Sequence, residues 1–311
     1  MNRATDNKIV LITQKTRLEN LIYRYNTESQ AEFYIEHHGG SFADYKLEHE
    51  TYHAALLCAK TYLESYGRLQ ILDRDYIPSF LFGKNDIVVA IGRDGLVANA
   101  LKYLDEQCLI GVNPDPKRWD GVLLPFAAQD LPQVIPEVAS GHRSVKTITF
   151  AEAKLNDGQS ILGVNDLFIG QKGHASARYG IALDGKSEAQ SSSGVIVSTG
   201  LGKTGWLKSI LAGAQGIDSY FGRSTAPKIP ADFDWSSDYL FYTVREPYPS
   251  TSTGAAIVFG TIRKQSPLQI VSYMPEDGVI FSDGVQEDRL EFNSGAIVTI
   301  GVAQRTGKLV V

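Results

Sequence analysis

Residues 86–104 (D-I-V-V-A-I-G-R-D-G-L-V-A-N-A-L-K-Y-L) constrain the fold of this chain more than any other segment. The apolar, mostly β-branched run Ile87–Ile91 predicts a strand that is buried on both faces. Gly92 and Gly95 allow backbone angles that other residues resist, so the chain can turn sharply after the strand. Apolar residues then recur at helical spacing. The segment therefore predicts a buried strand, a tight Gly-Arg-Asp-Gly turn and a helix.

The turn itself has two interpretations. A strand-to-helix turn of this kind brings backbone N–H groups and a helix N-terminus together, which favours the binding of an anion such as phosphate. Asp94 lies in the middle of the turn, where a carboxylate would repel that anion. Its presence is reasonable if it binds a cation or takes a proton from an attacking hydroxyl. The alternative is an ordinary turn in which Asp94 caps the helix, and these residues alone favour neither.

Length and charge narrow the class of protein. A chain of 311 residues is long enough for one large domain or two of ordinary size. Its 30 basic and 35 acidic residues give a formal charge of −5, which disfavours a general nucleic-acid-binding or membrane-surface protein. The first residues lack the pattern of a signal peptide, and no apolar run approaches the ~20 residues of a membrane span. We expect a cytoplasmic protein with neither nucleic-acid nor membrane partners.

Two parts of the chain differ in pattern. Strands and helices alternate through residue 143, which predicts an α/β domain (residues 1–143) with a Rossmann-like parallel sheet. Ligands of such sheets bind beyond the carboxyl ends of the strands. From residue 144, short strands separated by Gly, Ser, Asp and Pro predict an all-β, sandwich-like domain (residues 144–311) with one helix at 204–214. In the first domain we expect strands at Lys8–Thr13, 69–72, 86–91 and Leu109–Val112, and helices at 17–36 and 49–66.

Polar residues follow or precede several of these strands. Asn113 begins a rigid Asn-Pro-Asp-Pro loop after the strand Leu109–Val112, and the pair Asn165 and Asp166 precedes a strand. Either set could contact a ligand, the pair by binding ribose hydroxyls or a base edge. Taken alone, each is more typical of a structural turn.

Residues 199–206 (T-G-L-G-K-T-G-W) form a third candidate loop. The Gly-Lys-Thr at its centre looks like the end of a Walker A motif, but the earlier glycine of that motif is replaced by Val197. It is nevertheless a Gly-rich strand-to-helix turn in which Lys203 and Trp206 suit a phosphate and a stacked ring. The alternative is a flexible turn with a solvated lysine.

Metal-binding patterns are absent from the sequence. The two cysteines form no CxxC motif, and the six histidines form no HExxH motif. His49 and His53 lie four residues apart on a predicted helix and could meet. A third ligand is not evident, so an exposed helix face is the favoured interpretation. We expect no metal-ligating residues.

These loops occur in a familiar order, and the chain resembles the NAD kinases. That family belongs to a superfamily, shared with diacylglycerol kinases, whose hallmark is a Gly-Gly-Asp-Gly loop. The resemblance covers nearly the whole chain and is closest to the mitochondrial-type branch. Besides the turn at 92–95, it is carried by 15–17 (K-T-R) with Glu19, 110–116 (I-G-V-N-P-D-P), 165–170 (N-D-L-F-I-G), 192–194 (S-S-G), 199–206, 245–247 (R-E-P), 283–284 (D-G) and 291–293 (E-F-N).

The resemblance implies a function. It implies an active site between the two domains that transfers the γ-phosphoryl group of ATP to the adenosine 2′-hydroxyl of NAD, giving NADP, with Mg²⁺. Partners would be NAD and ATP, in a homo-oligomer (dimer or tetramer). Asp94 matches the proposed base, and Asn165 and Asp166 match an Asn-Glu pair that holds the dinucleotide. The remaining implied contacts are Gly92, Arg93 and Gly95 to phosphates, and Asn113, Lys203, Thr204, Gly205 and Trp206 to nucleotide.

The chain departs from the family pattern at several of these positions. Arg93 replaces the second glycine of the hallmark loop, and it could either neutralise triphosphate charge or close the phosphate cradle. Asp166 is one methylene shorter than the usual Glu, and Lys203 stands at a small-residue position. Two alternatives to an NAD kinase therefore stay open: a kinase of another hydroxyl substrate, such as a sugar or lipid, and a non-catalytic nucleotide-binding protein.

Overall fold

The chain folds into two compact units. The computed structural model describes residues 4–222 and 229–311. The first unit comprises Met1–Lys146 together with Lys308–Val311, and the second comprises Thr147–Gly307. The expected domain boundary at residues 143 and 144 stays a prediction. The four C-terminal residues, expected in the second domain, lie in the first unit because Leu309 pairs with Leu109 in its sheet and both side chains are fully buried.

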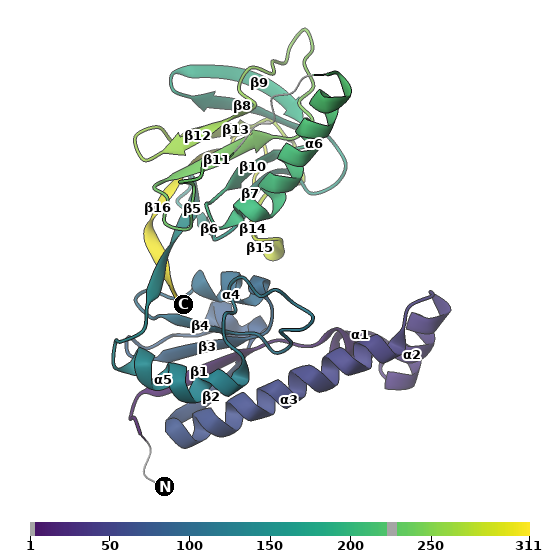
Figure 1. The fold of residues 1–311 in the computed structure, drawn as a ribbon. Coiled ribbons are helices and arrows are strands. Elements are labelled where there is room, and N and C mark those ends of the chain that lie inside the picture. Colours follow the sequence, from purple (N-terminus) through teal and green to yellow (C-terminus); the bar gives the residue numbers. More distant parts are fainter. Residues whose placement is uncertain (1–3, 223–228) are drawn as a thin grey trace. The chain divides into compact units, whose positions relative to one another are not determined.

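A parallel sheet forms the centre of the first unit (Figure 1). Its strands run in the order β2-β1-β3-β4, and the end of β16 adds to β4. The sheet strands are β1 (Lys8–Thr13), β2 (Arg68–Asp73), β3 (Ile87–Ile91) and β4 (Leu109–Val112). The helices are α1 (Arg17–Tyr25), α2 (Glu28–His37), α3 (Phe42–Tyr66), α4 (Asp94–Leu101) and α5 (Leu131–Ala139), with short 3-10 turns η1 (Arg74–Ser79) and η2 (Ala128–Asp130).

Helices cover both faces of this sheet. Side chains of α3 and α5, among them Leu63 and Leu131, pack on the strands in one buried cluster. Helix α4 lies on the opposite face (Figure 1). This arrangement explains the continuous burial of Ile87–Ile91. The predicted Rossmann-like α/β architecture is thereby confirmed.

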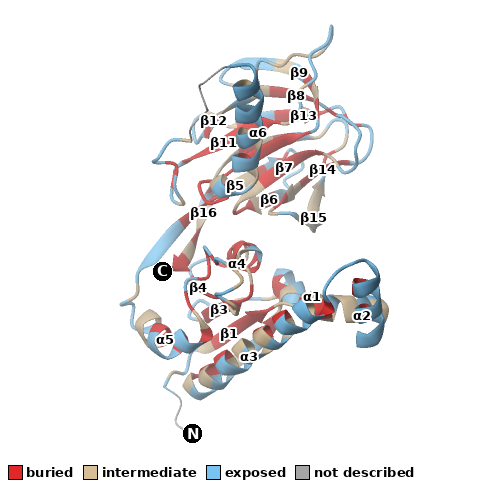
Figure 2. Ribbon diagram, turned by 45° about the vertical axis from the view of Figure 1, so that its right-hand side comes forward, coloured by how far each residue is buried: buried red, intermediate tan, exposed pale blue. Residues whose placement is uncertain are grey.

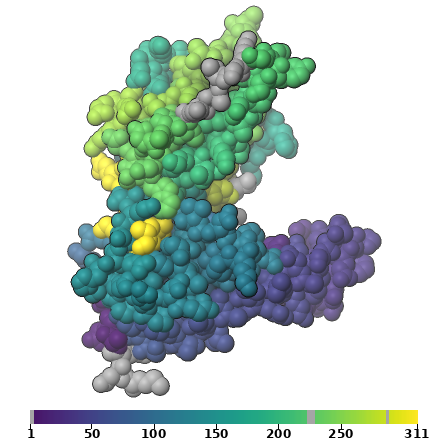
Figure 3. Space-filling view, viewed as in Figure 1, coloured from purple at the N-terminus to yellow at the C-terminus, as the bar shows by residue number. Residues whose placement is uncertain are grey.

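The expected helix at residues 17–36 is wrong, because the chain forms two helices there. Asn26 has a left-handed backbone (φ +70°) that ends α1. The Thr27 side chain then accepts a hydrogen bond from the backbone of Gln30 and starts α2. The two helices belong to the purple extension on the right of Figure 3, which projects from the rest of the first unit. Helix α5 was not expected because Pro132 and Pro136 interrupt its pattern.

The second unit is a sandwich of two sheets. One sheet contains β16, β13, β8 and β9 with β5 and β6, and the other has the order β12-β11-β10-β7-β14-β15. Alternate residues of the strands point into one shared apolar core, which appears red in Figure 2. The predicted sandwich-like fold is confirmed. The strands are β5 (Val145–Leu155), β6 (Ser160–Gly163), β7 (Asp166–Gln171), β8 (Ala177–Leu183), β9 (Lys186–Ser192), β10 (Val195–Ser198), β11 (Tyr239–Val244), β12 (Phe259–Arg263), β13 (Leu268–Ser272), β14 (Gly278–Ser282), β15 (Val285–Glu291) and β16 (Ile297–Val310).

One helix, α6 (Trp206–Tyr220), follows β10 after a short 3-10 turn, η3 (Gly202–Thr204). It packs on the outer face of the second sheet, where Trp206 and Ile210 contact Phe168 and Ile196. Among the helices of residues 4–222 and 229–311, none combines the length and apolar character that crossing a membrane requires.

Candidate functional site

A cavity of about 310 Å³ lies at the carboxyl ends of the parallel strands in the first unit. The chain passes from β1 outward to β2 and then places β3 on the other side of β1. Loops after β1 and β3 therefore diverge, and such a switch point is where open α/β sheets bind ligands. Residues after all four strands, the first turns of α1 and α4 and two side chains of α3 line the cavity: Gln14, Lys15, Thr16, Arg17, Asn20, Glu48, Tyr52, Arg74, Gly92, Arg93, Gly95, Leu96, Pro114, Asp115 and Trp119.

The predicted Gly-Arg-Asp-Gly turn forms one wall of this cavity. Gly92, Arg93 and Gly95 line it, whereas Asp94, where α4 begins, is not among the lining residues. Asp94 is the first helical residue, so it does not cap the helix. Its carboxylate Oδ1 instead accepts a hydrogen bond of 2.7 Å from the backbone N–H of Leu123. The structure thus holds this carboxylate beside a helix N-terminus in a defined orientation.

Arg93 points toward α3. Its guanidinium forms an ion pair of 2.7 Å with Oε1 of Glu48 and lies over the ring of Trp119, 4.4 Å from the centroid. Glu48 is largely buried and also pairs with Arg17. A buried carboxylate between two guanidinium groups compensates their charge. Arg93 is therefore part of the cavity wall, where Glu48 and Trp119 hold its side chain.

Further ion pairs connect the rim of the cavity. Asp44 pairs with Arg17 at 2.9 Å and with Arg118 at 2.7 Å, and both arginines hold the pKa of the Asp44 carboxyl below its usual value. Lys15 pairs with Asp75 at 2.8 Å. Networks of this kind limit the motion of long charged side chains. Of the cations that line the cavity, Lys15, Arg17 and Arg93 are thus ion-paired.

Asn113 organises the loop after β4. Its Nδ2 donates to the carbonyl of Trp119 at 2.9 Å, and its Oδ1 accepts from the backbone N–H of Asp115 at 3.0 Å. The side chain is buried. Both ends of the amide are thus engaged within the loop that brings Asp115 and Trp119 to the cavity, which makes Asn113 a positioning residue in this structure.

In the second unit, two predicted loops lie against each other. The backbone N–H of Thr199 donates to the carbonyl of Asn165 at 3.0 Å, and the Thr199 hydroxyl donates to the carbonyl of Val164 at 2.6 Å. A Cβ on Gly202 would lie 2.0 Å from the same Asn165 carbonyl oxygen. Only glycine permits this approach. The sequence therefore brings Asn165 and Asp166 next to the Gly-rich loop at 199–205.

Asp283 holds the Asn165 and Asp166 loop in place. It lies with Gly284 in a two-residue hairpin turn between β14 and β15, where both residues have positive φ. Its Oδ1 accepts hydrogen bonds from the backbone N–H groups of Val164, Asn165 and Asp166 at 3.1, 2.6 and 3.3 Å. Burial, with the neighbouring Asp283 charge, raises the pKa of Asp166 to about 7.

The raised pKa of Asp166 predicts a pH-dependent stability. The unfolded-state pKa is about 3.9, so the folded chain binds more protons between pH 4 and 7 and loses stability as pH rises through that window. We expect Asp166→Asn to stabilise the chain by about 1–3 kcal/mol at pH 8 and to have little effect at pH 4.5. Urea unfolding at both pH values measures this difference.

Asp157→Asn is the matched control, because the backbone and side chain of Gln159 lower the pKa of the Asp157 carboxyl. Its removal should destabilise the chain at pH 8, which is the opposite sign. An equal gain in the free energy of unfolding for Asp166→Asn at both pH values would contradict the assignment of a raised pKa to Asp166.

The remaining predicted residues lie around the start of α6. Lys203 Nζ donates to the carbonyl of Phe233, and Thr204 and Gly205 are exposed. Trp206 stacks on Phe168, with ring centroids 5.8 Å apart and planes at 9°, and Arg245 lies over its ring. These three residues line a cavity of about 260 Å³ that also contains Lys172, His174 and Ser193. The second unit thus presents an aromatic wall beside cationic side chains.

Three residues of these sites escaped the sequence analysis. Glu48 and Trp119 belong to no recognised sequence motif, and it is the fold that places them in contact with Arg93. Asp283 lies in one of the motifs that carry the family resemblance, but the sequence assigns it no role. Its signal was available, because Asp-Gly between two apolar runs is typical of a tight hairpin.

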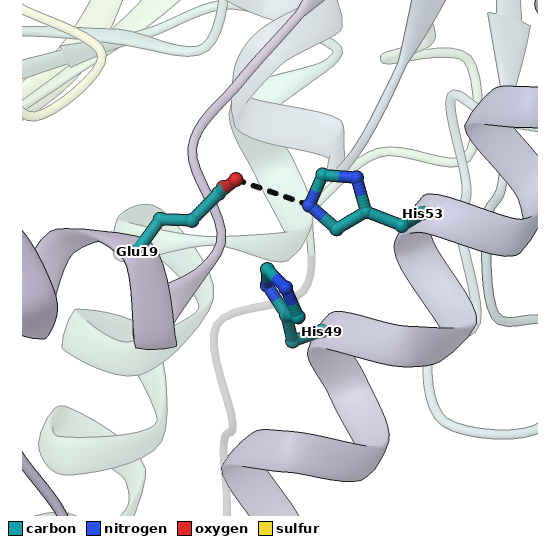
Figure 4. Close-up of side chains that lie close together, drawn as sticks. All are labelled: Glu19, His49 and His53. Atoms are coloured by element: carbon teal, nitrogen blue, oxygen red, sulfur yellow. Dashed lines mark hydrogen bonds and ion pairs between the residues drawn. The ribbon is translucent and has the colours of Figure 1, made fainter. Parts of the chain in front are cut away.

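Three side chains that could bind a metal ion also lie close together between α1 and α3. Glu19, His49 and His53 place one potential metal-binding atom each within 4.8 Å of one another (Figure 4). Oε1 of Glu19 lies 3.0 Å from Nε2 of His53. Besides the two histidines, Glu19 is therefore the third potential metal ligand, which the sequence did not reveal. It lies 30 residues before His49.

Comparison with known proteins places this fold. No protein-family model matches the chain. A curated NAD kinase from Chlorobaculum tepidum is 30% identical over 125 residues, which is 39% of this chain and 43% of that protein. The crystal structure of an NAD kinase from Archaeoglobus fulgidus in complex with ATP matches 97% of this chain and 93% of its own, with a TM-score of 0.55 and 13% identity. The crystal structure of yeast NADH kinase complexed with NADH matches 99% of this chain and 84% of its own, with a TM-score of 0.57 and 15% identity.

These likenesses show that the chain has the fold of NAD and NADH kinases, as the sequence predicts. The sequence match spans less than half the length of the curated relative. The structural match extends over both units of the chain.

Proposed function

We propose that this chain is an NAD kinase, which transfers the γ-phosphoryl group of ATP to the adenosine 2′-hydroxyl of NAD. The observation that carries the proposal is the position of the Gly-Arg-Asp-Gly turn at the switch point of a sheet with the NAD-kinase fold. Asp94 belongs to this turn, and the Leu123 amide orients its carboxylate. The similarity to the Chlorobaculum tepidum NAD kinase supports the same activity.

In the proposed reaction, Asp94 acts as the general base. The 2′-hydroxyl oxygen of NAD attacks the γ-phosphorus of ATP, the bond from that phosphorus to the bridging oxygen breaks, and ADP leaves. Asp94 takes the hydroxyl proton. Catalysis of phosphoryl transfer depends on positioning and charge stabilisation more than on covalent chemistry, and a carboxylate held by a backbone amide meets the need for positioning.

The cations of the cavity are suited to phosphate groups. Lys15, Arg17, Arg74 and Arg93 line it together with Gly92 and Gly95. Arg93 is paired with Glu48, so in our proposal it meets phosphate from a fixed position in the wall. Guanidinium groups recognise phosphate through paired hydrogen bonds. Arg93 would thereby stabilise charge where the family hallmark has a glycine.

Mg²⁺ is the divalent ion that this chemistry requires, and it prefers oxygen ligands. The carboxylates that line the cavity, Glu48 and Asp115, each pair with an arginine, Arg93 at 2.7 Å and Arg118 at 3.3 Å. The ion would enter together with ATP, with Glu48 and Asp115 as the carboxylates of the cavity. When bound, it would neutralise charge on the phosphate groups.

We assign nucleotide binding in the second unit to the two adjoining loops. Asn165 and Asp166 would hold ribose hydroxyls, and Thr204 and Gly205 would pack on the nucleotide with Lys203 near phosphate. Trp206 would stack on a ring of the ligand, because its indole stands in a cavity beside Arg245 and Ser193. Asn113 contributes by positioning the loop that carries Trp119.

Trp206→Ala is expected to weaken binding of NADP about tenfold or more, because one stacked base is worth about 1–3 kcal/mol. Trp206→Phe keeps an aromatic face and should stay within about threefold of the parent. Isothermal titration calorimetry of both variants measures the change. Equal affinity for the parent and Trp206→Ala would remove Trp206 from the ligand site.

A panel of acceptors tests the proposed substrate. The chain is incubated with γ-labelled ATP, Mg²⁺ and, in separate reactions, NAD, NADH, a hexose and diacylglycerol vesicles. We expect label in NAD or NADH and little in the other acceptors. Transfer to the sugar or lipid alone would favour a kinase of another hydroxyl. Binding of NAD without transfer to any acceptor would favour a non-catalytic nucleotide-binding protein.

Further parts of the proposal rest on the resemblance of the motifs. We propose that the chain belongs to the mitochondrial-type branch, acts in the cytoplasm and assembles as a dimer or tetramer. Light scattering after size-exclusion chromatography measures the assembly, and a mass equal to one chain of 34.1 kDa would contradict it.

A further inference from the structure

We propose that Glu19, His49 and His53 form a binding site for a divalent transition-metal ion, of which Zn²⁺ is the preferred one. The bound ion would join α1 to α3. Two imidazoles and one carboxylate are a ligand set that zinc sites use, and it leaves a fourth position for water. The site is separate from the residues assigned to phosphoryl transfer. It therefore stands whether or not the proposed kinase activity is found.

The geometry supports such a site. The donors lie within 4.8 Å of one another, and ligands of a tetrahedral zinc ion stand about 3.4 Å apart at metal distances of about 2.1 Å. Small rotations of the three side chains therefore suffice. Figure 4 shows the Glu19 carboxylate and the His53 ring facing each other, with the His49 ring beside them. His49 and His53 come from successive turns of α3, with ring centroids 4.3 Å apart.

Neighbouring groups already orient the ligands. Nδ1 of His49 lies 2.9 Å from the hydroxyl of Thr16, and this contact fixes the orientation of the ring, as hydrogen bonds to metal-binding imidazoles do. Oε2 of Glu19 accepts the backbone N–H of Thr16 at 2.7 Å, so its Oε1 faces His53. The capping box that starts α1 thus holds two of the three ligands in place.

The ligand types select the metal. Imidazole nitrogen suits zinc, copper, nickel and iron, whereas Mg²⁺ and Ca²⁺ prefer carboxylate, carbonyl and water oxygens. A site with two imidazoles and one carboxylate therefore discriminates against the Mg²⁺ that accompanies ATP. The donors are half-buried, so an ion can enter from solvent.

A metal ion bound at this site would stabilise one wall of the cavity in the first unit. Thr16 both contacts His49 and lines the cavity, and Tyr52 lines it one residue before His53. An ion that ties Glu19 to α3 would hold the segment 14–20, which forms the wall next to the Gly-Arg-Asp-Gly turn. We infer that metal binding rigidifies this wall.

Zinc binding by the untagged 311-residue chain tests the proposal. After removal of metals with a chelator, equilibrium dialysis against Zn²⁺ is expected to give one ion per chain with a dissociation constant of about 1 µM or lower. Co²⁺ bound in its place should show the intense visible absorption of four-coordinate cobalt. Hydrogen exchange in peptides covering 14–25 and 45–55 should slow when Zn²⁺ is present.

Glu19→Gln and His53→Gln keep side-chain size, and each is expected to weaken zinc binding at least about tenfold. The control is the double variant His37→Gln and His38→Gln, an exposed histidine pair at the end of α2 outside the cluster, which should bind like the parent. Circular dichroism confirms that the variants fold, and a variant that unfolds is replaced by His49→Gln. Absence of stoichiometric binding by the parent, or loss of binding in the control but not in His53→Gln, would overturn the proposal.

Discussion

Asp94→Asn is expected to lower the rate of NADP formation about 10²- to 10⁴-fold while leaving the fold unchanged. The substitution removes the base but keeps an oxygen that accepts the Leu123 amide. The shape of the turn between β3 and α4 is thereby preserved. Steady-state kinetics with NAD and ATP measure kcat and KM, and the effect should appear in kcat because the carboxylate acts on the hydroxyl proton in the transition state.

The matched control is Asp120→Asn, an exposed residue of the loop after β4. It should keep the activity of the parent. Thermal unfolding should give the same Tm for the parent and both variants. If Asp94→Asn retained more than about a third of the activity, Asp94 would not be the base, and the proposed mechanism would be wrong.

Glu48→Ala is expected to destabilise the chain by about 2–4 kcal/mol. Glu48 is largely buried and accepts charged hydrogen bonds from Arg17 and Arg93. Its removal leaves Arg93 without its carboxylate partner and leaves Arg17 with Asp44 alone. Chemical unfolding monitored by circular dichroism measures the change.

Glu50→Ala, an exposed position on the same helix, is the control and should change stability by less than about 0.5 kcal/mol. Glu48→Gln keeps an acceptor without the charge and should fall between the two. Equal stability of Glu48→Ala and the parent would show that the ion-pair network does not hold the cavity wall.

The fold could be predicted to the extent that local patterns decide it. Buried parallel strands such as Ile87–Ile91 are continuous apolar runs, so periodicity alone identifies them. The edge strands β9 and β15 escaped because their residues are mostly polar, K-S-E-A-Q-S-S and V-Q-E-D-R-L-E. Charged edge strands avoid aggregation but look like loops in the sequence. The break between α1 and α2 depends on one left-handed Asn26, which an apolar pattern does not reveal.

The candidate site could be predicted only where its residues lie in loops next to strands. The turn at 92–95 follows β3 and Asn113 follows β4, so the strand-end rule indicated both. Asn165 precedes β7 and was indicated by the family resemblance instead. Glu48 and Glu19 come from helices far away in the sequence, and their roles arise from packing of α3 on the sheet and on α1. The direction of the Arg93 side chain likewise follows from Glu48 and Trp119, which no local motif encodes.

Formation of NADP by the purified chain tests the central claim most directly. The chain is incubated with NAD, ATP and Mg²⁺, and NADP and ADP are quantified by liquid chromatography and mass spectrometry, with the phosphate position read by an NADP-specific dehydrogenase. We predict equal amounts of NADP and ADP, with far less of both from Asp94→Asn. NADP formation no greater than that of Asp94→Asn would contradict the assignment of this chain as an NAD kinase.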